Sequence, residues 1–172
     1  MDSKNETVDI IKSLLLKLSE SERNVREYIN TTRYQNKLIE NLSTWNQICS
    51  SLDVTGDTIY SINDYIISEF PQQNGLKYIF IYGILQSLFL QQDAIANLHE
   101  AFDIKFDLTP SLKKIRFIRN ASIGHPTKQN LNKVNYYNYI SRTTMSKSGF
   151  TLMRSGRDGF EEFIDVDLFS LI

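Results

Sequence analysis

The chain has 172 residues, of which 41% are hydrophobic, and a formal net charge of −1. This length and composition allow one hydrophobic core and exclude a disordered protein. The single cysteine, Cys49, cannot form an internal disulfide, and no secretory leader is recognisable, so we expect a protein of the reducing cytoplasm. The longest apolar stretch, residues 78–90, is too short to span a bilayer, so we expect a soluble protein without membrane contact.

The charges are distributed unevenly along the chain. Residues 1–107 carry 9 basic and 15 acidic side chains, residues 108–157 carry 10 basic and no acidic ones, and residues 158–172 carry 5 acidic and no basic ones. A basic segment of this size predicts a surface for an anionic ligand, and the phosphates of RNA or DNA are the plainest candidates. The alternative is that these charges pair with the acidic amino-terminal helices inside the fold.

Residues 5–52 are expected to be helical, because apolar residues recur mostly at spacings of three and four. Two long helices, or one helix interrupted near residues 30–32, fit this pattern. Residues 52–57 contain Gly56 and Asp57, a pair that indicates a turn. Asp57 can then cap a short helix that reaches about Phe70, before Pro71.

Residues 75–101 form the most apolar of the expected helices, and their apolar side chains surround the helix axis. This is typical of a central, buried helix. At about 100° per residue, one narrow sector of this helix is polar. Its members are Tyr82, Gln86, Asp93 and Asn97. Buried polar groups need partners, so this sector is a candidate for pairing with a charged side chain.

The last third of the chain changes from helix to strand. Thr109 and Pro110 predict the start of a helix over residues 110–123, with Gly124 as its left-handed cap. Residues 135–145 and 149–155 predict a β-hairpin, and a third short strand is expected at residues 160–166. The predicted fold class is therefore mainly α. An antiparallel helical bundle occupies residues 1–130, and a small β-hairpin appendage at residues 131–172 packs on it.

The stretch RNASIGHP, residues 119–126, is the candidate site. On a helical wheel Arg119 falls in an apolar sector, where a guanidinium needs an anion or a carboxylate, and Asp93 is a candidate carboxylate. Because Gly124 and Pro126 end the helix, His125 can fold back towards Arg119. Such a pair suits phosphodiester chemistry, since the histidine can move a proton while the arginine stabilises charge on phosphoryl oxygens.

The segment from Arg119 to His125 resembles the R-x(4-6)-H motif of HEPN domains. Leu85–Leu98 is similar to the helix that precedes this motif in bacterial HEPN-like proteins, and the resemblance covers about residues 5–130. The resemblance implies a metal-independent endoribonuclease with Arg119 and His125 as the catalytic pair. Asn120 would orient one of them or the phosphate, and two protomers would bring their motifs together as a homodimer. The biological roles that the resemblance suggests are phage defence and toxin–antitoxin systems.

The implied reaction is attack of the RNA 2′-hydroxyl on the adjacent phosphate, which leaves a cyclic phosphate and a 5′-hydroxyl. An antitoxin or another protein is a possible partner. Arg116 and Asp93 are supporting candidates from the residues themselves. The candidates for RNA phosphate contact are Lys113, Lys128, Lys133 and Arg142. Tyr136, Tyr137 and Tyr139 can stack on bases, although alternating aromatic residues in a strand are more often packing residues.

Two other functions remain open at this stage. The chain can be a non-catalytic module that uses the basic segment to bind RNA, a nucleotide or a protein, or Arg119 can simply pair with Asp93 to stabilise the bundle. No metal and no cofactor are expected. Two histidines and one cysteine do not provide the spacing of a zinc site, and no glycine-rich phosphate loop is present. His99 is better interpreted as a surface or packing residue.

Overall fold

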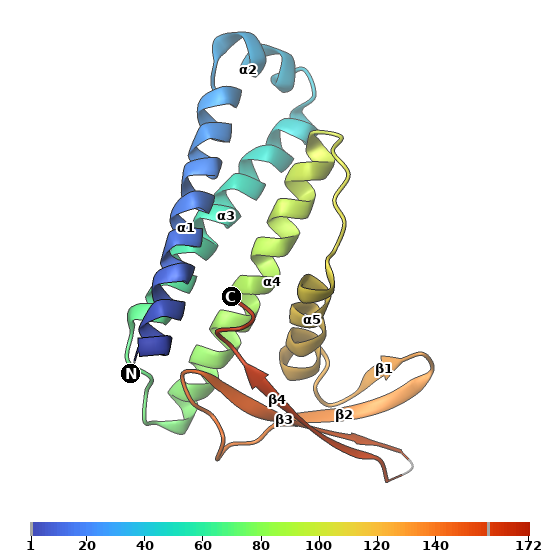
Figure 1. Cartoon of the computed structure of the whole chain (residues 1–172). Helices are drawn as coiled ribbons and strands as arrows, with labels where there is room; N and C mark the ends of the chain where they lie inside the picture. The colour runs from blue at the N-terminus through green and yellow to red at the C-terminus, as the bar shows by residue number, and fades with distance from the viewer. Residues whose placement is uncertain (1, 158) are drawn as a thin grey trace. The chain divides into compact units, whose positions relative to one another are not determined.

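The computed structural model describes residues 2–157 and 159–172, with side chains from Glu6 onwards. This part of the chain contains five α-helices, one π-helical turn and a four-stranded antiparallel sheet (Figure 1). The expected mainly α class is confirmed. The packing defines two compact units. Unit 1 comprises residues 1–67 and 90–107, and unit 2 comprises residues 68–89 and 108–172. Unit 2 thus contains residues from both of the expected domains, 1–130 and 131–172.

Unit 1 consists of helices. They are α1 (Asp2–Ile29), α2 (Thr32–Ile39), α3 (Leu42–Ile67) and the carboxyl-terminal part of α4 (Asn74–Ala101). The expected interruption near residues 30–32 is confirmed, and a second break separates α2 from α3. Buried Ile29, Ile48 and Leu52 form a core cluster, against which Trp45 and Leu98 pack. The cluster therefore joins α1, α3 and α4.

The turn expected at residues 52–57 is absent, because α3 continues through Gly56 and Asp57. Leu52, the first residue of the expected turn, and Ile62, which follows it, are both fully buried. Burying two such side chains stabilises the fold by several kcal/mol, whereas a glycine inside a helix costs about 1 kcal/mol relative to alanine. Packing therefore outweighs the local turn signal, and Asp57 is not a helix cap.

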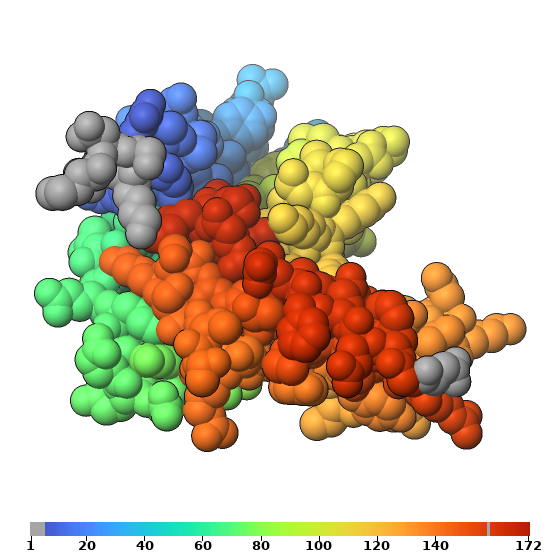
Figure 2. All heavy atoms as spheres, turned by 60° about the horizontal axis from the view of Figure 1, so that its bottom comes forward, coloured from blue at the N-terminus to red at the C-terminus, as the bar shows by residue number. Residues whose placement is uncertain are grey.

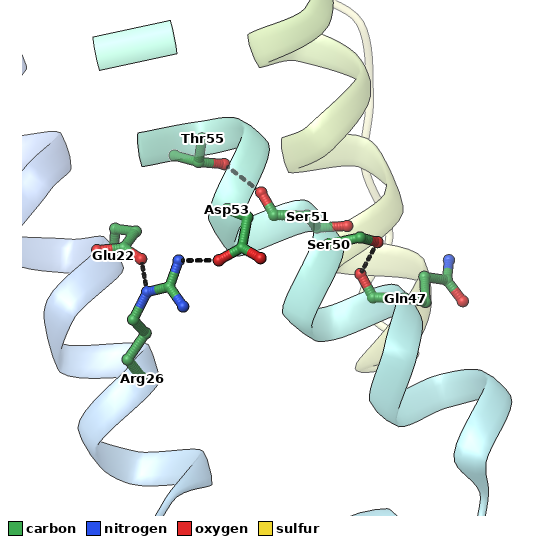
Figure 3. Close-up of polar contacts among 7 residues, drawn as sticks. All are labelled: Glu22, Arg26, Gln47, Ser50, Ser51, Asp53 and Thr55. Carbon is green, nitrogen blue, oxygen red and sulfur yellow. Dashed lines mark hydrogen bonds and ion pairs between the residues drawn. The ribbon is translucent and has the colours of Figure 1, made fainter. Parts of the chain in front are cut away.

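One charged network links α1 to α3 (Figure 3). Arg26 donates a hydrogen bond to Glu22 on its own helix, and its Nη2 donates to Oδ1 of Asp53 at 2.8 Å. Partial burial lowers the pKa of Arg26, but the hydrogen bonds to Asp53 and Glu22 outweigh this effect and raise it above its ordinary value. Arg26 and Asp53 are 38% and 67% exposed, so we expect the ion pair between them to contribute no more than about 1 kcal/mol.

Unit 2 combines the amino-terminal half of α4 with α5 (Pro110–Arg119), the π-helical turn η1 (Asn120–Gly124) and the sheet. The expected start of α5 is confirmed: Thr109 caps it by accepting a hydrogen bond from the amide of Leu112 at 3.3 Å. The strands are β1 (Gln129–Leu131), β2 (Val134–Ile140), β3 (Gly149–Gly156) and β4 (Glu161–Asp167). Each strand pairs antiparallel with the next in chain order, so the predicted hairpin is part of a larger meander.

The strand missed from the sequence is β1. It has three residues, Gln, Asn and Leu, which carry no β-strand signal. A two-residue turn, Asn132–Lys133, joins it to β2, and both residues have positive φ angles of 51° and 69°. These values are those of a type I′ hairpin turn, whose twist matches that of the strands it connects.

The sequence had indicated that the helix over residues 75–101 is buried on all sides. Helix α4 is instead exposed on part of its surface. Ile81, Ile84 and Leu85 are buried, whereas Leu76 and Ile79 are exposed. By length and composition alone α4 is apolar enough to cross a membrane, a property shared by core helices of soluble proteins. Solubility and cytoplasmic localisation stay predictions.

Candidate active site

The helix that carries Arg119 ends in a π-helical turn. The amide of His125 donates to the carbonyl of Asn120 at 2.8 Å, five residues earlier, where an α-helix would pair residues four apart. The prediction that Gly124 is a left-handed cap is wrong, because Gly159 is the one described glycine with a positive φ. Single π turns inside or at the end of α-helices are frequent at functional sites.

Gly124 leaves room for the guanidinium of Arg119. A Cβ atom added at this residue would lie 2.8 Å from Nη1 of Arg119 and 3.2 Å from Oδ1 of Asn120. The first distance is shorter than van der Waals contact permits. The guanidinium of Arg119 therefore rests directly on the residue that precedes His125, and any larger side chain would displace it.

The guanidinium of Arg119 is held by two side-chain amides. Its Nε and Nη2 donate to Oε1 of Gln86 at 3.1 and 3.0 Å, and its Nη1 donates to Oδ1 of Asn120 at 2.9 Å. These bonds use three of the five N–H groups of the guanidinium. Both partners are neutral, so these hydrogen bonds fix the guanidinium without neutralising its charge.

An aromatic ring on α4 supports the same guanidinium. The Cζ atom of Arg119 lies 4.2 Å from the centroid of the Phe89 ring, and Cζ of Arg116 lies 4.8 Å from it. The ring attracts both cations, but two like charges three residues apart on a helix repel each other. The structure thus brings Arg116, a supporting candidate, over the same ring as Arg119.

Asp93, the expected carboxylate partner, lies seven residues after Gln86 along α4 and belongs to unit 1. Its pairing with Arg119 stays a prediction. Sequence reasoning placed Gln86 on the polar sector of this helix but missed its role as the partner of Arg119. It also missed Phe89, because one aromatic residue in an apolar helix carries no signal of its own.

His125 is exposed, and its imidazole forms no hydrogen bond within the part of the chain that the structure describes. The chain after it is fixed to the sheet. The amide of Asn138 on β2 donates to the carbonyl of Pro126 at 2.7 Å, and the side chain of Asn138 donates to Gln129 on β1 at 3.2 Å. The sheet therefore positions the backbone next to His125.

The four candidates for phosphate contact all lie in unit 2 and are exposed. Lys113 is on α5, Lys128 precedes β1, Lys133 is in the β1–β2 turn and Arg142 follows β2. Arg154, which belongs to the same basic segment, is turned inward instead. Its side chain is only 10% exposed, is 3.7 Å from Glu162, and lies over the rings of Tyr136 and Phe117.

The remaining candidates have structural explanations. The rings of His99 and Phe106 pack at 5.3 Å, in line with a packing role for this histidine. Tyr136 points to the same side as Arg154, whereas Tyr137 and Tyr139 are exposed on the opposite face of the sheet. Within the described residues, no group of three or more His, Cys, Asp or Glu side chains can hold a metal ion.

Comparison with protein-family models, curated proteins and solved structures gives no match for this chain. The functional interpretation therefore depends on the geometry around Arg119 and His125.

Proposed function

We propose that this protein is a metal-independent endoribonuclease of the HEPN type. Its finer fold would be a HEPN-like helical bundle, and it would act as a homodimer in the bacterial cytoplasm, in phage defence or as the toxin of a toxin–antitoxin pair. The observation that supports this best is the fixed guanidinium of Arg119, which neutral amides hold against the residue preceding an exposed histidine. The resemblance of residues 119–125 to the R-x(4-6)-H motif supplies the reaction class.

In this mechanism His125 takes the proton from the 2′-hydroxyl of the ribose. The 2′-oxygen attacks the neighbouring phosphorus, and the bond from phosphorus to the 5′-oxygen breaks. The 5′-oxygen takes up a proton from solvent water and leaves as a hydroxyl group. The products are a 2′,3′-cyclic phosphate and a 5′-hydroxyl end. Arg119 stabilises the negative charge that develops on the phosphoryl oxygens, and its hydrogen bonds to Gln86 and Asn120 fix its orientation in advance.

The test is RNA cleavage by Arg119→Ala and His125→Ala. We expect each substitution to lower the cleavage rate by at least about 100-fold, the usual contribution of a proton-transfer group or a charge-stabilising donor. Arg157→Ala is the matched control, because it removes an exposed charge of the same segment outside the catalytic pair and outside the candidates for phosphate contact. Circular dichroism verifies the fold of each variant, and cleavage should continue in EDTA. Cleavage that survives both active-site changes, or that requires a divalent metal, would contradict the proposal.

One observation favours a second candidate, a non-catalytic RNA- or nucleotide-binding module. A catalytic histidine is normally oriented by a hydrogen-bond partner, and the imidazole of His125 has none among the described residues. In that case RNA binding would persist in His125→Ala and would fall steeply with salt, while no cyclic phosphate product would form.

A further inference from the structure

Strand β4 forms a free edge of the sheet. The sheet order is β1-β2-β3-β4, so β4 has a neighbour on one side only. Leu168 donates to the carbonyl of Ser148, and Gly156 donates to that of Phe160, which fixes the phase of the β3–β4 ladder. In an antiparallel ladder, hydrogen-bonded pairs alternate with pairs that form no hydrogen bond. The backbone groups that bond to β3 are therefore those of Glu162, Ile164 and Val166.

The backbone groups of Glu161, Phe163 and Asp165 therefore point away from β3. Within the described residues they have no hydrogen-bond partner. These three residues are exposed, and the side chain of Phe163 is 61% exposed. At three alternate residues the free edge thus presents both an N–H and a C=O group, and such an edge can bind an additional strand.

The side chains of the same three residues form a charged pattern. In register they lie opposite Ser155, Met153 and Thr151 of β3, which are all uncharged. The one polar contact is the hydroxyl of Thr151, which donates to Oδ1 of Asp165 at 2.8 Å. Two carboxylates thus flank one exposed aromatic ring, and the residues opposite them on β3 carry no charge. Figure 2 shows the strands of this sheet, orange to red, as a continuous surface.

We propose that the free edge of β4 binds an extended segment of another protein, in which two basic residues flank an apolar one at alternate positions. Such a strand would bond to the outward backbone groups of β4. Its apolar residue would cover Phe163, and its basic residues would pair with Glu161 and Asp165. This site is separate from Arg119 and does not depend on the nuclease activity.

The charges also argue against other occupants. RNA phosphates would be repelled by the two carboxylates, although Tyr137 and Tyr139 lie on the same face. A second copy of β4, paired antiparallel around Phe163, would place Glu161 opposite Asp165 of the other chain, and like charges directly opposite destabilise a sheet. The strand at the other edge of the sheet, β1, has only three residues, so it can pair with an added strand over a short length only.

The experiment uses the full-length protein and a fluorescent peptide, Thr-Lys-Thr-Ile-Thr-Lys-Thr, with fluorescence anisotropy as the readout. We expect the peptide to bind to the wild-type protein. Glu161→Lys combined with Asp165→Lys should raise its Kd by about tenfold or more. The same variant should bind a peptide with Glu in place of Lys. Asp9→Lys combined with Glu20→Lys changes the net charge equally on α1 and should leave the Kd unchanged.

Backbone pairing is tested by two peptides with N-methyl groups at alternate residues. In each peptide the methyl groups block the N–H groups along one edge of the extended strand, and the two peptides differ in the edge that is blocked. One of them should lose binding at least tenfold, and the other should retain it. The proposal is overturned if the lysine peptide fails to bind at about 1 mM, if the double variant binds it equally well, or if both N-methylated peptides bind. It is also overturned if sedimentation shows a dimer that the double variant dissociates, since β4 would then pair with a second copy.

Discussion

At the scale of single residues, the way in which two neutral side-chain amides hold the guanidinium of Arg119 is the central feature. A half-buried guanidinium usually pairs with a carboxylate, because burying an unpaired charge is costly. Here its hydrogen bonds go to Gln86 and Asn120, which orient the guanidinium but leave its charge available. A group of this kind attracts an anionic ligand more strongly than a solvated surface arginine does, since fewer water molecules screen it.

Gln86→Glu tests this interpretation directly. The glutamate has nearly the same shape, so Arg119 should keep its position, but a carboxylate would neutralise it. We expect the RNA cleavage rate to fall at least tenfold while the melting temperature stays the same or rises. Gln91→Glu, on the same helix but hydrogen-bonded to Thr58 in unit 1, is the control for added charge. Full cleavage by Gln86→Glu would show that the free charge of Arg119 is not needed.

At the scale of elements, the sequence located the start of α5 correctly but not the geometry of its end. The signals at Thr109 and Pro110 fixed the start of α5, because capping chemistry is local. The π turn at its end was not predicted, because no local sequence signal marks it, and the contacts around it, at Gly124 and Pro126, are tertiary contacts. The continuous helix α3 was also missed, since its stability comes from core burial rather than from residues 56 and 57.

Gly124→Ala separates helix stability from site geometry. Alanine is favoured over glycine in a helix by about 1 kcal/mol, but its Cβ would push Nη1 of Arg119 away. We therefore expect little loss of stability and a decrease of at least tenfold in RNA cleavage. Gly83→Ala on α4 is the matched control, because a Cβ there meets nothing within 4 Å. It should raise the melting temperature by a few degrees without changing cleavage. Equal cleavage by Gly124→Ala and wild type would refute the spatial role of this glycine.

At the scale of the whole molecule, the two units have opposite formal charges. Unit 1 carries 8 basic and 14 acidic residues, whereas unit 2 carries 11 basic and 6 acidic ones. The charge asymmetry along the sequence was thus a correct guide to a basic unit. The sequence did not indicate that Arg154 is turned inward, or that two acidic side chains lie on the exposed face of β4, because both depend on strand register.

RNA binding by His125→Ala should be strongly salt-dependent if unit 2 provides the phosphate contacts. For about four contacts to single-stranded RNA, raising the salt from 50 to 200 mM should weaken the affinity by about 50-fold. Lys128→Ala combined with Arg142→Ala should make the plot of log affinity against log salt shallower by about 1.4, while Lys12→Ala combined with Lys17→Ala on α1 should not change it. Filter binding at several salt concentrations measures these slopes, and an affinity that does not respond to salt would contradict the assignment.

The hydrogen bond between Asn138 and Pro126 has a practical consequence. From the sequence, a shortened chain ending at residue 130 is the natural minimal domain, because the strands look like an appendage. The strand β2, however, holds the backbone immediately after His125. Shortening the chain there would leave residues 119–126 without this attachment, so a fragment chosen for crystallisation or for screening inhibitors has to retain the sheet.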